Sequence, residues 1–162
     1  MHDVLAVANN RQKKLAAFAS VRSLQAHAVQ TADEVLKTCD IIISTVPASP
    51  GFTPFLDARN LKPDALAVMV DLGRSWIVES FAAFDYTATD SLHQSRHPYD
   101  NQGNELISVT AQGDLESLIR QPLIARGRKA FFFKGIAAAD IAVATIVYQG
   151  AIETSCGILL ER

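Results

Sequence analysis

The sequence predicts an α/β fold of the Rossmann-like, doubly wound type, with a mostly parallel sheet. One observation is that short apolar runs alternate along the chain with segments of helical spacing, as they do in βαβ units. A second is the run 41–43, which is Ile at every position. Such a run is typical of a strand that helices cover on both faces.

Composition agrees with one globular domain. At 162 residues, with 49% hydrophobic and 20% charged residues, the chain is long enough to bury a core. A net charge of −2 gives no reason to expect nucleic acid or an anionic membrane as a partner. Cys39 and Cys156 are far apart and form no metal-binding or redox pair, which indicates packing roles and a reducing compartment. We therefore expect a soluble, cytoplasmic protein.

In the first half of the chain, three strands are expected. Residues 4–8 form a short apolar run that ends in a polar turn and is followed by helical spacing. Residues 26–30 are a weaker strand pattern. Thr31 and Glu34 have capping-box spacing, so a short helix is expected before the main strand at 40–46.

The second half predicts three more strands, at 65–70, 86–89 and 130–134. Between them, a helical turn is expected at 77–84, an exposed loop at 93–104 and a short helix at 115–119. The final helix, 136–154, is apolar nearly all round, so something must cover it.

Several motifs resemble the ornithine cyclodeaminase/mu-crystallin family, whose members are NAD(P)-dependent enzymes acting on amino acids, imines or 2-oxo acids. The motifs are Asn10-Arg11, residues 15–19, residues 39–46, residues 61–64, Gly113-Asp114-Leu115, Phe133-Lys134-Gly135 and residues 140–148. They follow the family's order over nearly the whole chain. The resemblance implies a dinucleotide-binding domain.

The chain also departs from the family. Members have a first strand, a glycine-rich phosphate loop and a helix before the segment with which this chain starts, and no GxGxxG occurs here. They also carry an N-terminal substrate and dimerisation domain. The resemblance thus implies that residues 1–162 are a partial NAD(P)-binding Rossmann-like domain, truncated at its first βα unit. Because that strand is central in the order 3-2-1-4-5-6, we expect a rearranged or open-edged sheet and a homo-oligomer.

The resemblance places Asn10 and Arg11 where the sheet meets the adenosine ribose. A guanidinium there can bind a 2′-phosphate, so Arg11 favours NADP(H) over NAD(H). A solvated helix start rich in Lys and Arg is the alternative, and a fragment that binds no dinucleotide also stays open.

At the other end of the dinucleotide, the resemblance places Thr45, Val46 and Pro47 beside the nicotinamide ribose. An ordinary strand-ending turn is the alternative for them. Val70 is a further cofactor contact, although many relatives have glycine there and valine hinders a close approach. Asp71 follows a buried strand and is our candidate general acid/base in the intact enzyme; turn capping is its alternative role.

Lys134 completes the candidate cofactor-binding residues, and a structural pair with Asp140 is its alternative role. His93 and His97 have i, i+4 spacing, but their segment predicts a loop and supplies no third ligand, so we expect no metal site.

The resemblance implies the NAD(P)-binding portion of an amino-acid or imino-acid oxidoreductase, inactive on its own. Its expected partners are the dinucleotide and, in the intact protein, an amino-acid or imino-acid substrate. Two alternatives stay open: a non-catalytic interaction or scaffold domain that has lost cofactor binding, and a different α/β enzyme that shares only the strand–helix alternation.

Overall fold

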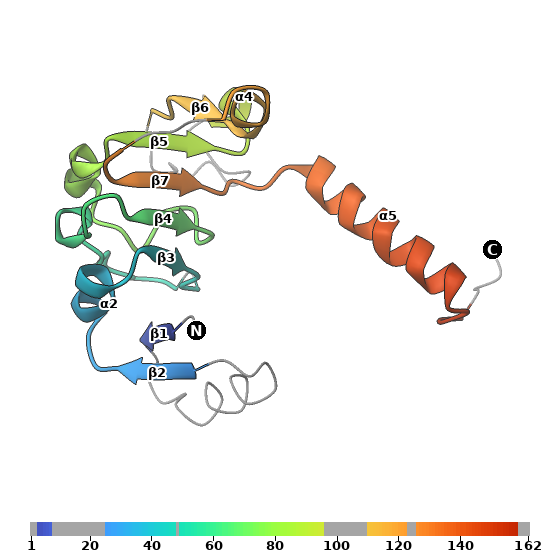
Figure 1. The fold of residues 1–162 in the computed structure, drawn as a ribbon, viewed down its shortest axis with the longest axis horizontal. Coiled ribbons are helices and arrows are strands. Elements are labelled where there is room, and N and C mark those ends of the chain that lie inside the picture. Colours follow the sequence, from blue (N-terminus) through green and yellow to red (C-terminus); the bar gives the residue numbers. More distant parts are fainter. Residues whose placement is uncertain (1–2, 8–24, 48, 96–109, 123–125, 159–162) are drawn as a thin grey trace.

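The computed structural model describes residues 3–7, 25–47, 49–95, 110–122 and 126–158. Five strands form one sheet in the order β3-β4-β7-β5-β6, and every neighbouring pair is parallel (Figure 1). The strands are β3 (Ile41–Ser44), β4 (Leu66–Met69), β5 (Tyr86–Thr89), β6 (Gly113–Asp114) and β7 (Lys129–Phe132). The predicted Rossmann-like parallel sheet is confirmed.

Two further strands form a separate sheet. β1 (Asp3–Val7) and β2 (Gln25–Val29) pair with each other in parallel, and in Figure 1 their arrows run opposite to that of β3. Among the described residues, no strand joins β1 to β3. The described strands therefore form two separate sheets, and β1 and β2 do not extend the parallel order of the large sheet.

One face of the large sheet, here called the inner face, carries the core. Burial alternates along β3, β4 and β7, and the buried residues are Ile42, Ala67, Met69, Ala130 and Phe132. The segments that connect the strands pack against them, including the short 3-10 helices η1 (Ala58–Asn60) and η2 (Val78–Ala83). In this core, the Phe81 ring lies 5.4 Å from that of Phe132.

The opposite, outer face is only partly covered. Ile41 is 61% exposed and Ile43 is 63% exposed, while their neighbours in the sheet, Leu66, Val68 and Phe131, are half-buried. The prediction that helices cover both faces of residues 41–43 is therefore wrong for the outer face. Its apolar side chains remain accessible.

Two of the described α-helices, α2 and α4, begin at a residue whose side chain caps them. Thr31 caps α2 (Ala32–Thr38) by accepting the Glu34 N–H at 3.4 Å, and Asp114 caps α4 (Leu115–Arg120) through a capping box with Ser117. α3 is the single turn Leu92–Ser95.

α5 (Ala137–Glu153) points away from the sheet, and none of its residues is buried (Figure 1). No described helix is long and apolar enough to cross a membrane.

Candidate functional site at the carboxyl edge of the sheet

The segments that follow β3, β4, β5 and β7 meet at one edge, because these strands are parallel. This carboxyl edge holds most of the sequence-predicted site residues. After β3, Thr45 and Pro47 are exposed and Val46 is half-buried. After β4, Val70 is 45% exposed, and its N–H donates to the Ser44 carbonyl at 3.0 Å. The rim is thus accessible, with apolar and hydroxyl side chains.

Asp71 lies below this rim, buried in a hydrogen-bond network. Its Oδ1 accepts from the Ser44 hydroxyl at 2.8 Å and from the Gly73 N–H at 3.2 Å, while its Oδ2 accepts from the Ser75 hydroxyl at 2.5 Å. The indole of Trp76 donates in turn to the Ser44 hydroxyl at 3.1 Å. Because Asp71 is only 6% exposed, its carboxylate depends on these three donors for the hydrogen bonds that water would supply.

Local backbone geometry makes this network possible. Leu72 and Gly73 have φ values of 62° and 76°, so the chain turns sharply after Asp71 and brings the Gly73 N–H and the Ser75 hydroxyl back to the carboxylate. A Cβ at Gly73 would lie 3.3 Å from the Phe132 ring. Glycine therefore meets both the backbone and the packing requirement at this position.

A second buried carboxylate, Asp90, was missed as a site residue. It follows β5 and is 5% exposed. Its Oδ2 accepts the backbone N–H groups of Lys134, at 3.0 Å, and Gly135, and its Oδ1 accepts that of Ser91 at 3.0 Å. Asp90 thus fixes the turn between β7 and α5. The available signal was an acid at the carboxyl end of a strand of the same parallel sheet, because Asp90 directly follows β5 and Asp71 lies two residues after β4.

Lys134 brings a buried cation to this edge. Its Nζ is shielded from solvent and has no hydrogen-bond partner in the part of the chain that the structure describes. Burial lowers the pKa of this amine below its usual 10.5, and the nearby Asp90 carboxylate opposes that shift. The proposed pairing of Lys134 with Asp140 is wrong, because Asp140 lies exposed on α5.

Other predicted residues are not brought to this edge. Asn10, Arg11 and His97 lie outside the described residues. His93 is exposed in α3, and the described residues contain no group of three or more His, Cys, Asp or Glu side chains that could hold a metal ion. Cys39 packs half-buried against the core and Cys156 is exposed, both as free thiols.

Comparison with known proteins places this edge in a wider context. No protein-family model and no curated protein matches the chain. Several solved structures match the chain. An archaeal alanine dehydrogenase dimer with bound NAD matches 99% of this chain at a TM-score of 0.74 and 20% identity, over 53% of its own chain. A Δ1-pyrroline-2-carboxylate reductase from Thermococcus litoralis, in complex with NADH and L-proline, matches 98% at 0.74 and 16% identity, over 52% of its chain.

A third solved structure is a lysine cyclodeaminase that recognises L-lysine, L-ornithine and L-2,4-diaminobutyric acid. It matches 96% of this chain at a TM-score of 0.74 and 17% identity, over 47% of its own chain. The chain has the fold of these proteins. This fold is the one expected from the cyclodeaminase resemblance. The chain spans about half of their length, which is consistent with a partial domain.

The edge fits a nicotinamide dinucleotide in part. In open α/β sheets, ligands bind outside the carboxyl ends of the strands, where Thr45, Pro47 and Val70 are exposed. The Nζ of Lys134, shielded from solvent and without a hydrogen-bond partner among the described residues, suits an anionic group that reaches it. The phosphate loop has no counterpart in this sequence.

Proposed function

We propose that residues 1–162 are the NADP-binding portion of a cytoplasmic, homo-oligomeric oxidoreductase of the ornithine cyclodeaminase/mu-crystallin family. The observation that supports this most strongly is the open carboxyl edge of a parallel sheet whose fold is that of NAD-binding enzymes of amino-acid and imino-acid metabolism. The intact enzyme would act on an amino acid or imino acid. This chain alone is not expected to catalyse the reaction.

In this proposal, Arg11 and Asn10 bind the adenosine end, with Arg11 on the 2′-phosphate. Thr45, Val46, Pro47 and Val70 line the nicotinamide end. The dinucleotide, when bound, supplies the hydride acceptor or donor for a carbon that carries nitrogen.

Lys134 and Asp71 complete the proposed site. The Lys134 ammonium, which has no hydrogen-bond partner in the described part of the chain, attracts an anionic group of the cofactor or substrate. Asp71 is proposed as the acid/base group of the intact enzyme. Because its carboxylate accepts hydrogen bonds from Ser44, Gly73 and Ser75, proton transfer requires this network to open. Until it opens, Asp71 holds the two segments of the nicotinamide end together.

Titration of the purified chain with NADPH and NADH tests the proposal, with binding followed by nicotinamide fluorescence and calorimetry. We expect tighter binding of NADPH, and a loss of that preference in Arg11→Ala. Arg120→Ala is the matched control, because Arg120 is an exposed arginine paired with Glu116 on α4. If the chain binds neither NADPH nor NADH, the proposal is wrong for this chain. If Arg11→Ala and Arg120→Ala weaken NADPH binding equally, the proposed role of Arg11 is wrong.

A second candidate function is a non-catalytic interaction domain that has lost cofactor binding. The exposed apolar residues of α5 and of the outer face favour it. A chain that forms a defined oligomer and binds neither dinucleotide would support this function over the first.

A further inference from the structure

Ser44 is a buried polar residue at the carboxyl edge to which the proposed function assigns no role. It is the last residue of β3, is 4% exposed and directly precedes the rim residues 45–47. Its hydroxyl donates to Asp71 at 2.8 Å and accepts the Trp76 indole N–H at 3.1 Å. Its carbonyl oxygen accepts the Val70 N–H at 3.0 Å and the Asp71 N–H at 3.2 Å. Ser44 therefore joins the end of β3 to the segment that follows β4.

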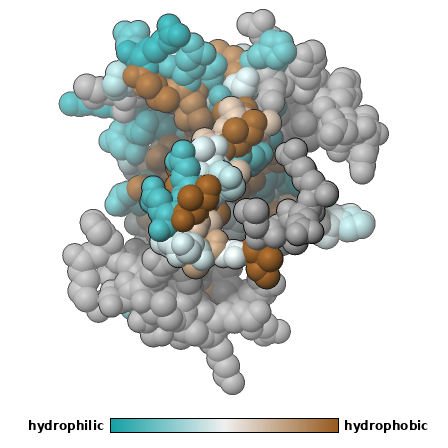
Figure 2. Space-filling model, turned by 90° about the vertical axis from the view of Figure 1, so that its right-hand side faces the viewer, coloured by the Kyte–Doolittle hydropathy of each residue, from teal (hydrophilic) through white to brown (hydrophobic). Residues whose placement is uncertain are grey.

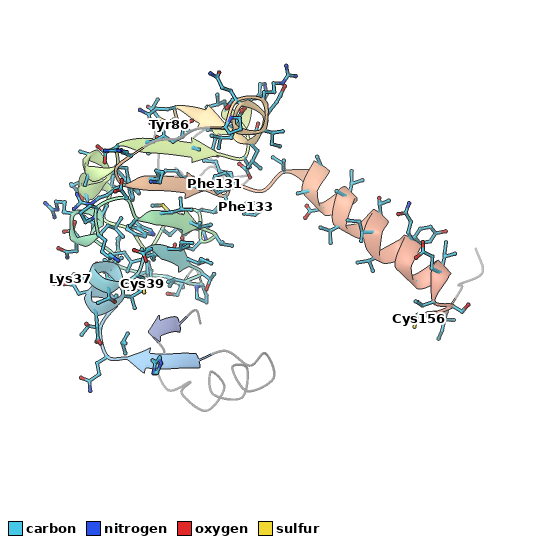
Figure 3. All side chains as sticks on the ribbon, in the orientation of Figure 1. Lys37, Cys39, Tyr86, Phe131, Phe133 and Cys156 are labelled. Carbon is cyan, nitrogen blue, oxygen red and sulfur yellow. The ribbon has the colours of Figure 1, made fainter. Side chains whose placement is uncertain are left out.

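The two segments that Ser44 joins are the two sides of the proposed nicotinamide end. In Figure 1 the arrows of β3, β4 and β7 point to the right, so Figure 2 faces the edge at which these strands end, and hydrophobic and hydrophilic residues lie side by side on this face. Phe133 directly follows β7 (Figure 3), and its N–H donates to the Met69 carbonyl at 3.2 Å. The main chain thus holds β4 to β7 up to this edge, whereas the turn after β4 is held to β3 through Ser44.

This turn has a backbone conformation that requires support. Leu72 has φ 62°, in the left-handed region that a leucine side chain disfavours. Such a conformation persists where the surrounding contacts hold it in place. The Asp71 carboxylate accepts the Gly73 N–H on the far side of Leu72, and Ser44 bonds to that same carboxylate. Without the Ser44 hydroxyl, the turn loses this side-chain bond to β3 and is free to relax, which moves Val70 relative to the β3 exit.

We propose that Ser44 is a positioning residue, which fixes the spacing between the two sides of the nicotinamide end and so sets the affinity for the nicotinamide half of the dinucleotide. This inference rests on the proposed function and adds to it a residue that acts through its neighbours. A site that is held in its binding geometry before the ligand arrives avoids the cost of ordering on binding. Loosening the β3–β4 spacing should therefore weaken contacts to the nicotinamide and spare the adenosine end, where Arg11 is proposed to bind.

Calorimetric titration with NADPH and with adenosine 2′,5′-bisphosphate tests this inference. The second ligand carries the adenosine and the 2′-phosphate but no nicotinamide. Ser44→Ala should weaken NADPH binding about tenfold and leave the affinity for adenosine 2′,5′-bisphosphate unchanged. Retention of the hydroxyl in Ser44→Thr should retain NADPH binding.

Ser80→Ala is the matched control for the loss of a buried serine hydroxyl. Ser80 is fully buried, donates to the Ile77 carbonyl at 2.6 Å and accepts the Ala58 N–H at 2.9 Å, so its hydroxyl also makes two hydrogen bonds. It lies in η2, which precedes the amino end of β5. Ser80→Ala should therefore lower the urea midpoint of unfolding about as much as Ser44→Ala does, yet leave both ligand affinities unchanged.

Circular dichroism verifies that each variant is folded. If Ser44→Ala does not fold, Trp76→Phe takes its place, because it removes the indole donor and leaves the bond between Ser44 and Asp71; it should weaken NADPH selectively but less. Equal losses of NADPH affinity in the edge variant and Ser80→Ala, or equal losses for the two ligands, would overturn the inference and leave the proposed function standing. A parent chain that binds NADPH no more tightly than adenosine 2′,5′-bisphosphate would also overturn it. A parent chain that binds neither ligand would overturn both proposals.

Discussion

Asp71 offers a sharp test of the carboxyl edge. In Asp71→Ala, three buried donors lose their acceptor: the Ser44 and Ser75 hydroxyls and the Gly73 N–H. Each unpaired donor costs about 1 kcal/mol, so we expect the free energy of unfolding to fall by roughly 3 kcal/mol. Asp71→Asn keeps an oxygen for two of these donors and should lose only about 1 kcal/mol.

Urea unfolding measures this loss. Trp76 is the single tryptophan of the chain and is fully buried, so its fluorescence reports unfolding. Its indole donates to Ser44 in the same network, so the substitution itself can change that fluorescence. Circular dichroism therefore provides a second signal. For a slope of about 1–3 kcal/mol per molar urea, the alanine variant should unfold at a midpoint lower by roughly 1–3 M. Asp40→Ala is the control, because the Asp40 side chain is 82% exposed in its ion pair with Lys62, and such pairs contribute about 0–1 kcal/mol. A loss in Asp71→Ala no larger than in this control would refute the reasoning.

Three further predictions concern the same edge. Gly73→Ala should lower the free energy of unfolding in urea by about 1–2 kcal/mol more than Gly51→Ala does. Both glycines have positive φ, but only Gly73 lies against the Phe132 ring. Lys134→Met should raise the free energy of unfolding at neutral pH, because it removes a buried amine whose charged form is disfavoured; since burial lowers the folded pKa, this gain should shrink as the pH rises toward 10.5. Asp90→Ala should speed hydrogen exchange of the Lys134 and Gly135 amides, whereas the amides of α2 should exchange as before.

Strands and helix starts were predictable because local chemistry determines them. The runs at 40–46 and 65–70 contain β3 and β4, and the strand expected at 86–89 has the bounds of β5. Thr31 was recognised as a cap from its spacing to Glu34 alone. A buried parallel strand needs an uninterrupted apolar run, and a helix start needs a side chain that accepts a free backbone N–H. Both patterns are local, so no tertiary contact was needed to find them.

The polar partners at the site were harder to predict, because they join distant parts of the chain. Asp71 was expected at the edge, but its partner Ser44 is 27 positions earlier, and nothing local to either residue indicates the pair. Asp90 likewise reaches the backbone of Lys134, which is 44 positions later. Parallel strand order brings these groups to one edge, and that order is set by the sheet as a whole. The expected Lys134–Asp140 pair was wrong because it considered only sequence neighbours.

The helix at the end of the chain shows how the sequence and the structure combine. Its apolar composition predicted that something covers it, while the structure leaves every residue of α5 unburied. None of the described residues supplies that cover. The outer face, apolar and accessible at Ile41 and Ile43, presents the same conflict from the side of the sheet. Composition thus predicts which surfaces of the chain need a cover, whereas the identity of that cover depends on tertiary or quaternary contacts that a local pattern does not encode.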